Sequence, residues 1–97
     1  MVRANKCILG CNGISSKSGV TTRNIMEVSV NQSMISNCIG VVYVLAHSYK
    51  VGITSNFKSA PIEKVDVLIT DTQADPTETS LIASHNVQIV QLSSLNG

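Results

Sequence analysis

Glycine and hydroxyl side chains are concentrated in one segment, residues 10–22, which reads GCNGISSKSGVTT. Glycine lets the backbone approach a ligand closely, and backbone N–H groups and hydroxyls can donate hydrogen bonds to an anion. This chemistry suits a small phosphorylated molecule. A flexible exposed loop has the same composition, so both interpretations stay open at this point. Gly10 and Gly13 form a G-x-x-G pattern, which is neither a dinucleotide fingerprint nor a P-loop.

Charged side chains follow two other apolar runs of the chain. Lys50 lies in AHSYKVG, residues 46–52, and Asp71 ends the motif ITD. A lysine at this place could bind a phosphate as a point charge, although a lone loop lysine is also common as a solvated charge. Neither His47 nor His85 has a partner at the spacing of a metal site or a catalytic pair. The residues therefore indicate a site that binds a ligand without catalysing a reaction.

Four short apolar runs predict the strands that position these residues. Their near-continuous apolar character is typical of a parallel sheet that is covered on both faces. Ligands of such a sheet bind beyond the carboxyl ends of the strands, where residues 10–22 and Lys50 would lie. The runs are residues 6–10, 41–46, 65–70 and 87–92.

A helix is predicted between the first two runs, from residue 23 or 25 to residue 37. Asn24 and Glu27, three residues apart, offer a reciprocal cap for its first turn. Apolar residues spaced by four form one stripe on this helix, which we expect to pack in the core. The stripe comprises Met26, Val30, Met34 and Cys38, with Val28 and Ile35 beside it.

A second helix is predicted between the last two runs. Asp75, Pro76 and Glu78 supply an N-cap, a first-turn proline and an acidic third residue, and Asn86 can close the helix. Residues 51–64 break any period, and we expect a loop with a short strand or a single helical turn near Pro61. The order of elements predicts an α/β fold with an open, mostly parallel sheet and flanking helices.

Composition narrows the functional classes. The chain has 97 residues, which suit one small domain, and an aromatic content of 3%, which requires an aliphatic core. The net charge of +1 comes from basic residues scattered along the chain, so no surface for nucleic acid is indicated. Three cysteines without a C-x-x-C pair indicate buried free thiols of an intracellular protein. The longest apolar run, residues 38–46, is shorter than the ~20 residues that a bilayer requires.

Five segments together resemble the sensor domain of a known family. ANKCILGCNGI, GVTT, MEVSVNQSMI, VYVLAHSYKVG and APIEKVDVLITD have the order and spacing of the C-terminal part of the effector-sensing domain of DeoR-family transcriptional regulators. The resemblance implies a fold similar to ribose-5-phosphate isomerase, glucosamine-6-phosphate isomerase and CoA transferase domains. It also implies that residues 1–97 are the C-terminal portion of the sensor domain, without the DNA-binding domain.

The resemblance further implies a repressor of sugar metabolism whose sensor domain binds a phosphorylated sugar. It implies contact with operator DNA only through the absent N-terminal helix-turn-helix. The residues themselves lead us to expect a cytoplasmic protein with no membrane partner, cofactor, metal or enzymatic activity. Because a partial domain leaves an exposed sheet edge that could mediate self-association, we also expect a homo-oligomer. An enzyme is the alternative: a phosphosugar isomerase with Glu27 or Asp71 as base and Lys50 as electrophile. The residues that match the family's motifs, and are thereby implied to bind the ligand, are Gly10, Asn12, Gly13, Gly19, Thr21, Thr22, Glu27, Lys50 and Asp71.

Overall fold

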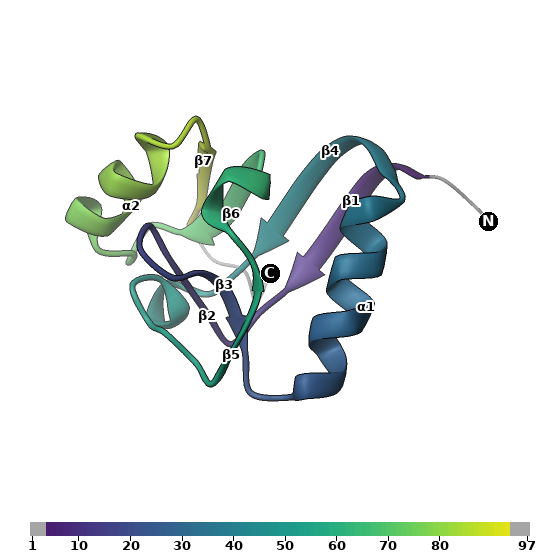
Figure 1. Cartoon of the computed structure of the whole chain (residues 1–97). Helices are drawn as coiled ribbons and strands as arrows, with labels where there is room; N and C mark the ends of the chain where they lie inside the picture. Colours follow the sequence, from purple (N-terminus) through teal and green to yellow (C-terminus); the bar gives the residue numbers. More distant parts are fainter. Residues whose placement is uncertain (1–3, 94–97) are drawn as a thin grey trace.

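The computed structural model describes residues 4–93. Its main sheet has four parallel strands in the order β1-β4-β6-β7, as the apolar runs predict. Figure 1 shows β1 and β4 running side by side in the same direction, so their carboxyl ends meet at one edge. The strands are β1 (Ala4–Gly10), β4 (Cys38–Leu45), β6 (Val67–Asp71) and β7 (Gln88–Leu92).

A second sheet, in the order β2-β3-β5, is antiparallel and occupies residues that we expected to form loops. Residues 10–22 are not a flexible exposed loop, because Ile14 and Val20 are completely buried and anchor the hairpin in the core. Near Pro61, where a short strand or a single helical turn was predicted, the chain forms both, β5 and the short 3-10 helix η2 (Ile62–Lys64). The strands are β2 (Gly13–Ser15), β3 (Gly19–Thr22) and β5 (Phe57–Ala60).

Two α-helices flank the sheets, α1 (Ile25–Ser36) beside β1 and α2 (Pro76–Ala83) beside β7 (Figure 1). Asn24 caps α1, since its side chain accepts a hydrogen bond from the Met26 backbone N–H at 2.9 Å. The reciprocal half of the predicted cap is wrong, because the Glu27 carboxylate accepts a hydrogen bond from the Thr22 hydroxyl instead.

The end signals of α2 act as the sequence predicts. The Asp75 side chain accepts a hydrogen bond from the Thr77 backbone N–H at 3.2 Å, and Pro76 stands in the first turn. Asn86 follows the helix with a φ of 67°, the left-handed conformation in which asparagine is tolerated better than most residues.

The core lies on one face of the main sheet. Leu9, Val44 and Leu68 lie side by side on that face in β1, β4 and β6, and each is at most 1% exposed. Ile14 of the small sheet and Ile82 of α2 belong to the same cluster. Burying each such side chain contributes about 1.5–3 kcal/mol, so this aliphatic cluster is the main stabilising element of the fold.

The described residues leave the opposite face of the main sheet partly open. Ile8 and Leu45, which alternate with Leu9 and Val44 along their strands, are 64% and 45% exposed. The prediction that both faces are covered is therefore wrong for residues 4–93, because the small sheet and both helices pack on the same face. Apolar side chains on the open face explain why the strands lack a polar-apolar alternation.

The apolar stripe of α1 also points away from the core. Met26 is 75% exposed and Val30 is 57% exposed, so the packing face predicted from periodicity is wrong. The face that packs contains Val28, Asn31 and Ile35, which are spaced three and four residues apart. Periodicity identifies the helix correctly, but two neighbouring faces carry apolar residues, and only tertiary contacts select between them.

Gly13 allows the hairpin to approach the segment after Lys50 closely. A Cβ atom at Gly13 would overlap the Ile53 carbonyl group, whereas a Cβ atom at Gly10 would meet no atom within 4 Å. We expect Gly13→Ala to lower the free energy of unfolding by about 1–3 kcal/mol, as overpacking commonly does. Gly10→Ala, the matched control, should change it by less than about 0.5 kcal/mol. Urea unfolding followed by circular dichroism measures both, and equal values would contradict this account of Gly13.

Candidate functional site

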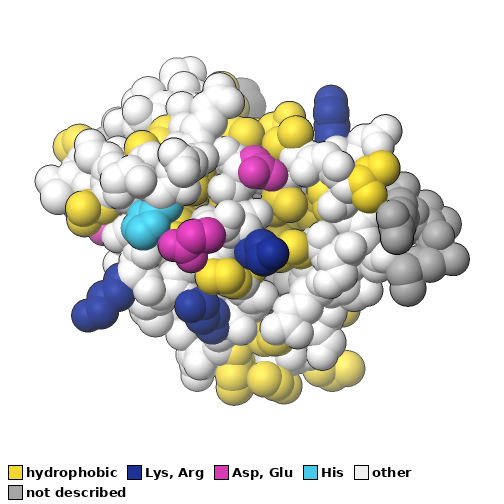
Figure 2. Space-filling model, turned by 45° about the horizontal axis from the view of Figure 1, so that its top comes forward, with side chains coloured by type: hydrophobic (Ala, Val, Ile, Leu, Met, Phe, Trp, Pro, Cys, Tyr) yellow, Lys and Arg dark blue, Asp and Glu magenta, His cyan; other side chains and the backbone are white. Residues whose placement is uncertain are grey.

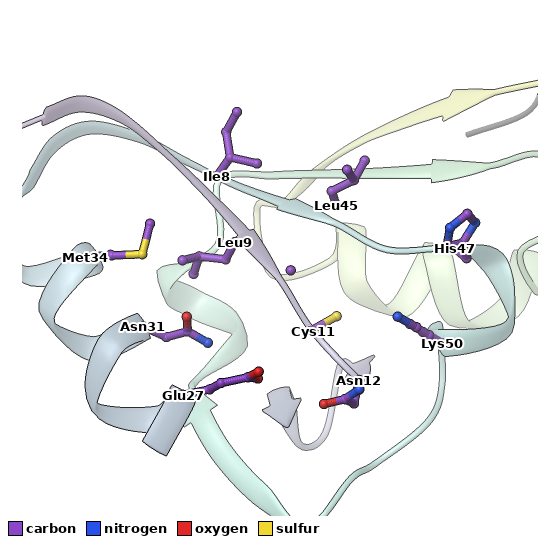
Figure 3. Close-up of a pocket in the computed structure, with 11 residues that line it drawn as sticks. Ile8, Leu9, Cys11, Asn12, Glu27, Asn31, Met34, Leu45, His47 and Lys50 are labelled. Atoms are coloured by element: carbon purple, nitrogen blue, oxygen red, sulfur yellow. The ribbon is translucent and has the colours of Figure 1, made fainter. Parts of the chain in front are cut away.

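A pocket of about 500 Å³ opens at the carboxyl ends of β1 and β4. Its walls are the end of β1, one side of α1 and the short 3-10 helix η1 (Ser48–Lys50), as Figure 3 shows. Four predicted ligand-binding residues line it, namely Gly10, Asn12, Glu27 and Lys50. The other lining residues are Ile8, Leu9, Cys11, Asn31, Met34, Leu45 and His47.

Lys50 reaches the pocket from η1 and is partly buried. Its side chain points toward Cys11 in Figure 3. Burial raises the pKa of the Cys11 thiol to about 11, and the nearby Lys50 charge opposes this rise. Within residues 4–93 no carboxylate forms a salt bridge with Lys50, whose Nζ lies 5.8 Å from the ring centre of Tyr49. A partly buried ammonium without a carboxylate partner favours an anionic ligand at this place.

Asp71, at the end of β6, holds the turn that carries Lys50. Its carboxylate accepts hydrogen bonds from the Ser48 backbone N–H at 3.0 Å and the Gln73 backbone N–H at 2.9 Å. The hydrogen bond from Ser48 is the main cause that lowers the pKa of the Asp71 carboxyl below its ordinary value, and the bond from Gln73 adds to it. Asp71 does not line the pocket, so the structure gives it a positioning role for Lys50.

The other end of this turn is tied to the small sheet. The Gly52 backbone N–H donates a hydrogen bond to the Ile14 carbonyl oxygen at 2.7 Å, and Ile14 and Val51 form an isolated parallel bridge. Lys50 is therefore held between the main sheet on one side and the hairpin on the other.

A hydrogen-bond network joins the end of β1 to the start of α1. Asn12 accepts from the Arg23 backbone N–H at 2.9 Å, and the Thr22 hydroxyl lies 3.1 Å from the same Asn12 oxygen. The Thr22 hydroxyl also contacts the Glu27 carboxylate and accepts from the Asn24 backbone N–H at 3.2 Å. Because this hydroxyl has one proton, it donates to only one of these oxygens at a time. The network fixes the Glu27 carboxylate at the rim of the pocket.

The remaining predicted residues build the hairpin and do not line the pocket. The Thr21 hydroxyl donates to the Gly13 carbonyl oxygen at 3.0 Å and accepts from the Ser55 backbone N–H at 2.9 Å. Gly19 has a φ of 73° at the turn and lies against the Ala60 carbonyl group. The structure thus brings together Gly10, Asn12, Glu27 and Lys50, with Thr22 adjacent, and leaves Gly13, Gly19 and Thr21 apart.

The serine hydroxyls that we expected to meet an anion have partners inside the protein. The Ser15 hydroxyl accepts from the Ser18 backbone N–H at 2.8 Å, and the Ser16 hydroxyl donates to Glu78 at 3.2 Å. The Thr54 hydroxyl donates to the Ser18 hydroxyl at 2.8 Å. These contacts stabilise the hairpin, so its hydroxyl content has a structural explanation.

Asn31 lines the pocket but is not among the predicted ligand-binding residues. It stands one helical turn after Glu27, and Figure 3 shows both side chains projecting from α1 toward the end of β1. The available sequence signal was a polar residue four positions after Glu27, between the apolar residues Val30 and Met34.

Metal-ligand groups and membrane-spanning helices can be assessed for residues 4–93. Within residues 4–93, no group of three or more His, Cys, Asp or Glu side chains could hold a metal ion. No helix in the same range is long and apolar enough to cross a membrane. Cys7 and Cys11 are buried free thiols, and Cys38 is a partly buried free thiol.

Asp71→Asn tests the positioning role of the carboxylate. Because its pKa is lower in the folded state, the charged carboxylate stabilises the fold above the unfolded pKa of about 4. This stabilisation is lost as the pH falls through the folded pKa. We expect the variant to melt below the wild type at pH 7, with a difference that shrinks as the pH falls below about 4. Thermal unfolding between pH 2.5 and 7 measures this, and Asp75→Asn, which retains a good N-cap, is the control. A difference independent of pH would contradict the assigned role.

Two comparisons with known proteins identify the family. A family model described as the DeoR C-terminal sensor domain matches residues 1–72. The HTH-type transcriptional regulator GlpR of Haloferax volcanii is 34% identical over 82 residues, covering 84% of this chain and 32% of that protein. The chain thus spans about a third of the length of this relative. We conclude that the chain belongs to the DeoR family of transcriptional regulators.

Proposed function

We propose that this sensor domain binds a phosphorylated sugar in the pocket beside Lys50. The supporting observation is the partly buried Lys50 ammonium, which faces the pocket and forms no salt bridge with residues 4–93. A phosphate is the metabolite group that such an ammonium binds best as a point charge. A pocket of about 500 Å³ also lies within the range typical of small-molecule sites.

The opposite side of the pocket suits the sugar part of the ligand. The Glu27 carboxylate accepts hydrogen bonds and is held in place by Thr22. Sugar hydroxyls donate hydrogen bonds to carboxylates, whereas a phosphate would be repelled there. The pocket therefore favours a ligand with an anionic end at Lys50 and a hydroxyl-rich end at Glu27.

Regulation follows if ligand binding changes the preferred conformation of the sensor. A ligand shifts an equilibrium only by its difference in affinity between two states. η1 is the element best placed to respond, because Lys50 lies in it and hydrogen bonds to Asp71 and Ile14 connect its two flanks to the two sheets. Closure of Lys50 onto the phosphate is the movement that would be passed to the rest of the regulator.

DNA contact belongs, in this proposal, to a helix-turn-helix domain outside the 97 residues. The chain carries a net charge of only +1. Figure 2 shows the Lys and Arg side chains of one face separated from one another, without a continuous basic surface. Because DNA binding depends on several neighbouring phosphate contacts, such a face is poorly suited to it. A regulator that meets DNA and a phosphorylated metabolite would act in the cytoplasm, as the sequence led us to expect.

The isomerase alternative is not retained. The family match and the regulator relative identify a sensor domain of a transcriptional regulator, not an enzyme. The geometry agrees with a binding role, since Asp71 is directed to the Ser48 and Gln73 backbone and does not line the pocket.

Lys50→Ala tests the anion site. Loss of a charge-assisted hydrogen bond of about 1.5–3 kcal/mol should weaken binding of the sugar phosphate about 10- to 100-fold. Isothermal titration with glucose 6-phosphate, fructose 1-phosphate and ribose 5-phosphate measures the affinity. Lys17→Ala, an exposed lysine outside the pocket, should bind like the wild type. Unchanged affinity in Lys50→Ala would remove Lys50 from the site.

We also propose that residues 1–97 are the C-terminal portion of a larger sensor domain, whose further chain covers the open face of the main sheet. Ile8 and Leu45 are exposed there, and β1 is an edge strand of the sheet. Parallel sheets are found with both faces covered. The relative is about three times as long as the part that this chain matches, so additional chain is available in that protein.

Substitution of the open face tests this proposal. We expect the chain to bind the apolar dye ANS, and we expect Ile8→Ser with Leu45→Ser to reduce dye binding. The melting temperature should fall by no more than about 4 °C, because both side chains already lie in water. Light scattering after gel filtration gives the oligomeric state. A dimer that dissociates in the double variant would instead place a second copy on this face, and would be the homo-oligomer expected from the sequence.

A further inference from the structure

We infer that the Asn31 amide forms hydrogen bonds with the hydroxyl end of the ligand. This contact makes the pocket selective for singly phosphorylated polyhydroxy compounds. The inference rests on the proposed function, because it takes the anionic end of the ligand to lie at Lys50. It adds a specificity-determining residue and excludes ligands with a second anionic group at the α1 side.

The burial of Asn31 is unusual for its helix. Asn31 is 8% exposed and is the one buried residue of α1, whereas Met26 and Val30 are mostly exposed. A helix that needed only to pack would place an apolar side chain at the buried position. An amide at this position therefore calls for a polar partner.

No such partner exists within residues 4–93. The side-chain hydrogen bonds of α1 and its two caps involve Asn24, Glu27 and Asn37, and none of them reaches Asn31. A primary amide has two donors and a carbonyl acceptor, and those of Asn31 are not sealed off from solvent, because Thr70 Oγ1 is the one fully enclosed side-chain N or O atom without a partner within residues 4–93. Figure 3 shows the Asn31 side chain directed from α1 into the pocket, so its partner is a molecule that enters there.

The charges around the pocket define which part of that molecule meets Asn31. Lys50 is the one ammonium or guanidinium among the lining residues, and His47 lies on the same side of the pocket. Glu27, one turn before Asn31, contributes the one carboxylate. A phosphate at the α1 side would meet a carboxylate and no cation, whereas a pair of hydroxyls can donate to Glu27 and exchange hydrogen bonds with the Asn31 amide.

Asn31→Leu tests the inference, since leucine has a similar volume and no polar atoms. We expect the tightest-binding of glucose 6-phosphate, fructose 1-phosphate and ribose 5-phosphate to bind about 10-fold more weakly to this variant. Binding of inorganic phosphate, which touches only the Lys50 side, should stay within about twofold of the wild type. The melting temperature should not fall, because the Asn31 amide forms no hydrogen bond within residues 4–93.

Affinity thus falls without a loss of stability, which a purely structural role would not produce. Gln32→Leu, the same type of change one residue away and outside this pocket, should leave binding unchanged. Wild-type protein should also bind the sugar monophosphate more tightly than fructose 1,6-bisphosphate. Asn31→Ala, which adds no bulk, should repeat the loss of affinity if leucine disturbs the helix.

The outcomes separate this inference from the proposed function. If the wild type binds neither a sugar monophosphate nor inorganic phosphate, the proposed function and the inference both fail. If the wild type binds a monophosphate and Asn31→Leu binds it equally well, or if bisphosphate binds more tightly, only the inference is overturned. Loss of folded structure in both Asn31 variants would make Asn31 a structural residue and would also overturn it.

Discussion

Parallel pairing of β1, β4 and β6 is the constraint on which the site depends. Gly10 lies beside Leu45, and Leu45 lies beside Ile69, so the three strands end at nearly the same level. The segments that follow them carry Asn12, the Lys50 turn and Asp71. A shift of one residue in this register would exchange the two faces of a strand and move Leu9 out of the core. The aliphatic core thus maintains the register, and the register places the polar groups of the site.

Two short hydrogen-bonded connections then give the pocket its polarity. On one side, Asp71 holds the Ser48 backbone and so places the Lys50 ammonium. On the other side, Thr22 holds the Glu27 carboxylate at the start of α1. The two charges stand on different walls of the pocket, and a ligand with a charged end and a hydroxyl-rich end matches that separation. Both connections lie at the edge of the sheet, outside the aliphatic core.

Several residues depart from the usual pattern of buried apolar and exposed polar side chains. Asn31 is buried, while Ile8, Leu45 and Met26 are exposed. A buried polar side chain beside a pocket is typical of a functional site, where local stability is given up for recognition. Exposed apolar side chains on a parallel sheet are typical of a surface that meets more protein. In our proposals, the first departure is assigned to the ligand and the second to the remainder of the regulator.

The sequence by itself determined the local elements. Apolar runs predicted the four parallel strands, and capping residues such as Asn24 and Asp75 marked the helix starts, because these signals act over a few neighbouring residues. Matching of motifs in order also identified the family, which the comparisons confirm.

Only the tertiary structure decided which residues meet. Gly19 and Thr21 belong to the same glycine- and hydroxyl-rich segment as Asn12. The strand that contains them, β3, pairs with β5, and neither residue lines the pocket. Asn31 gains its place because α1 turns its Val28–Asn31–Ile35 side inward, which periodicity could not distinguish from the Met26–Val30 side. The reason is physical: strand and helix propensities depend on local sequence, whereas the choice of packing face depends on the surfaces that the rest of the chain presents.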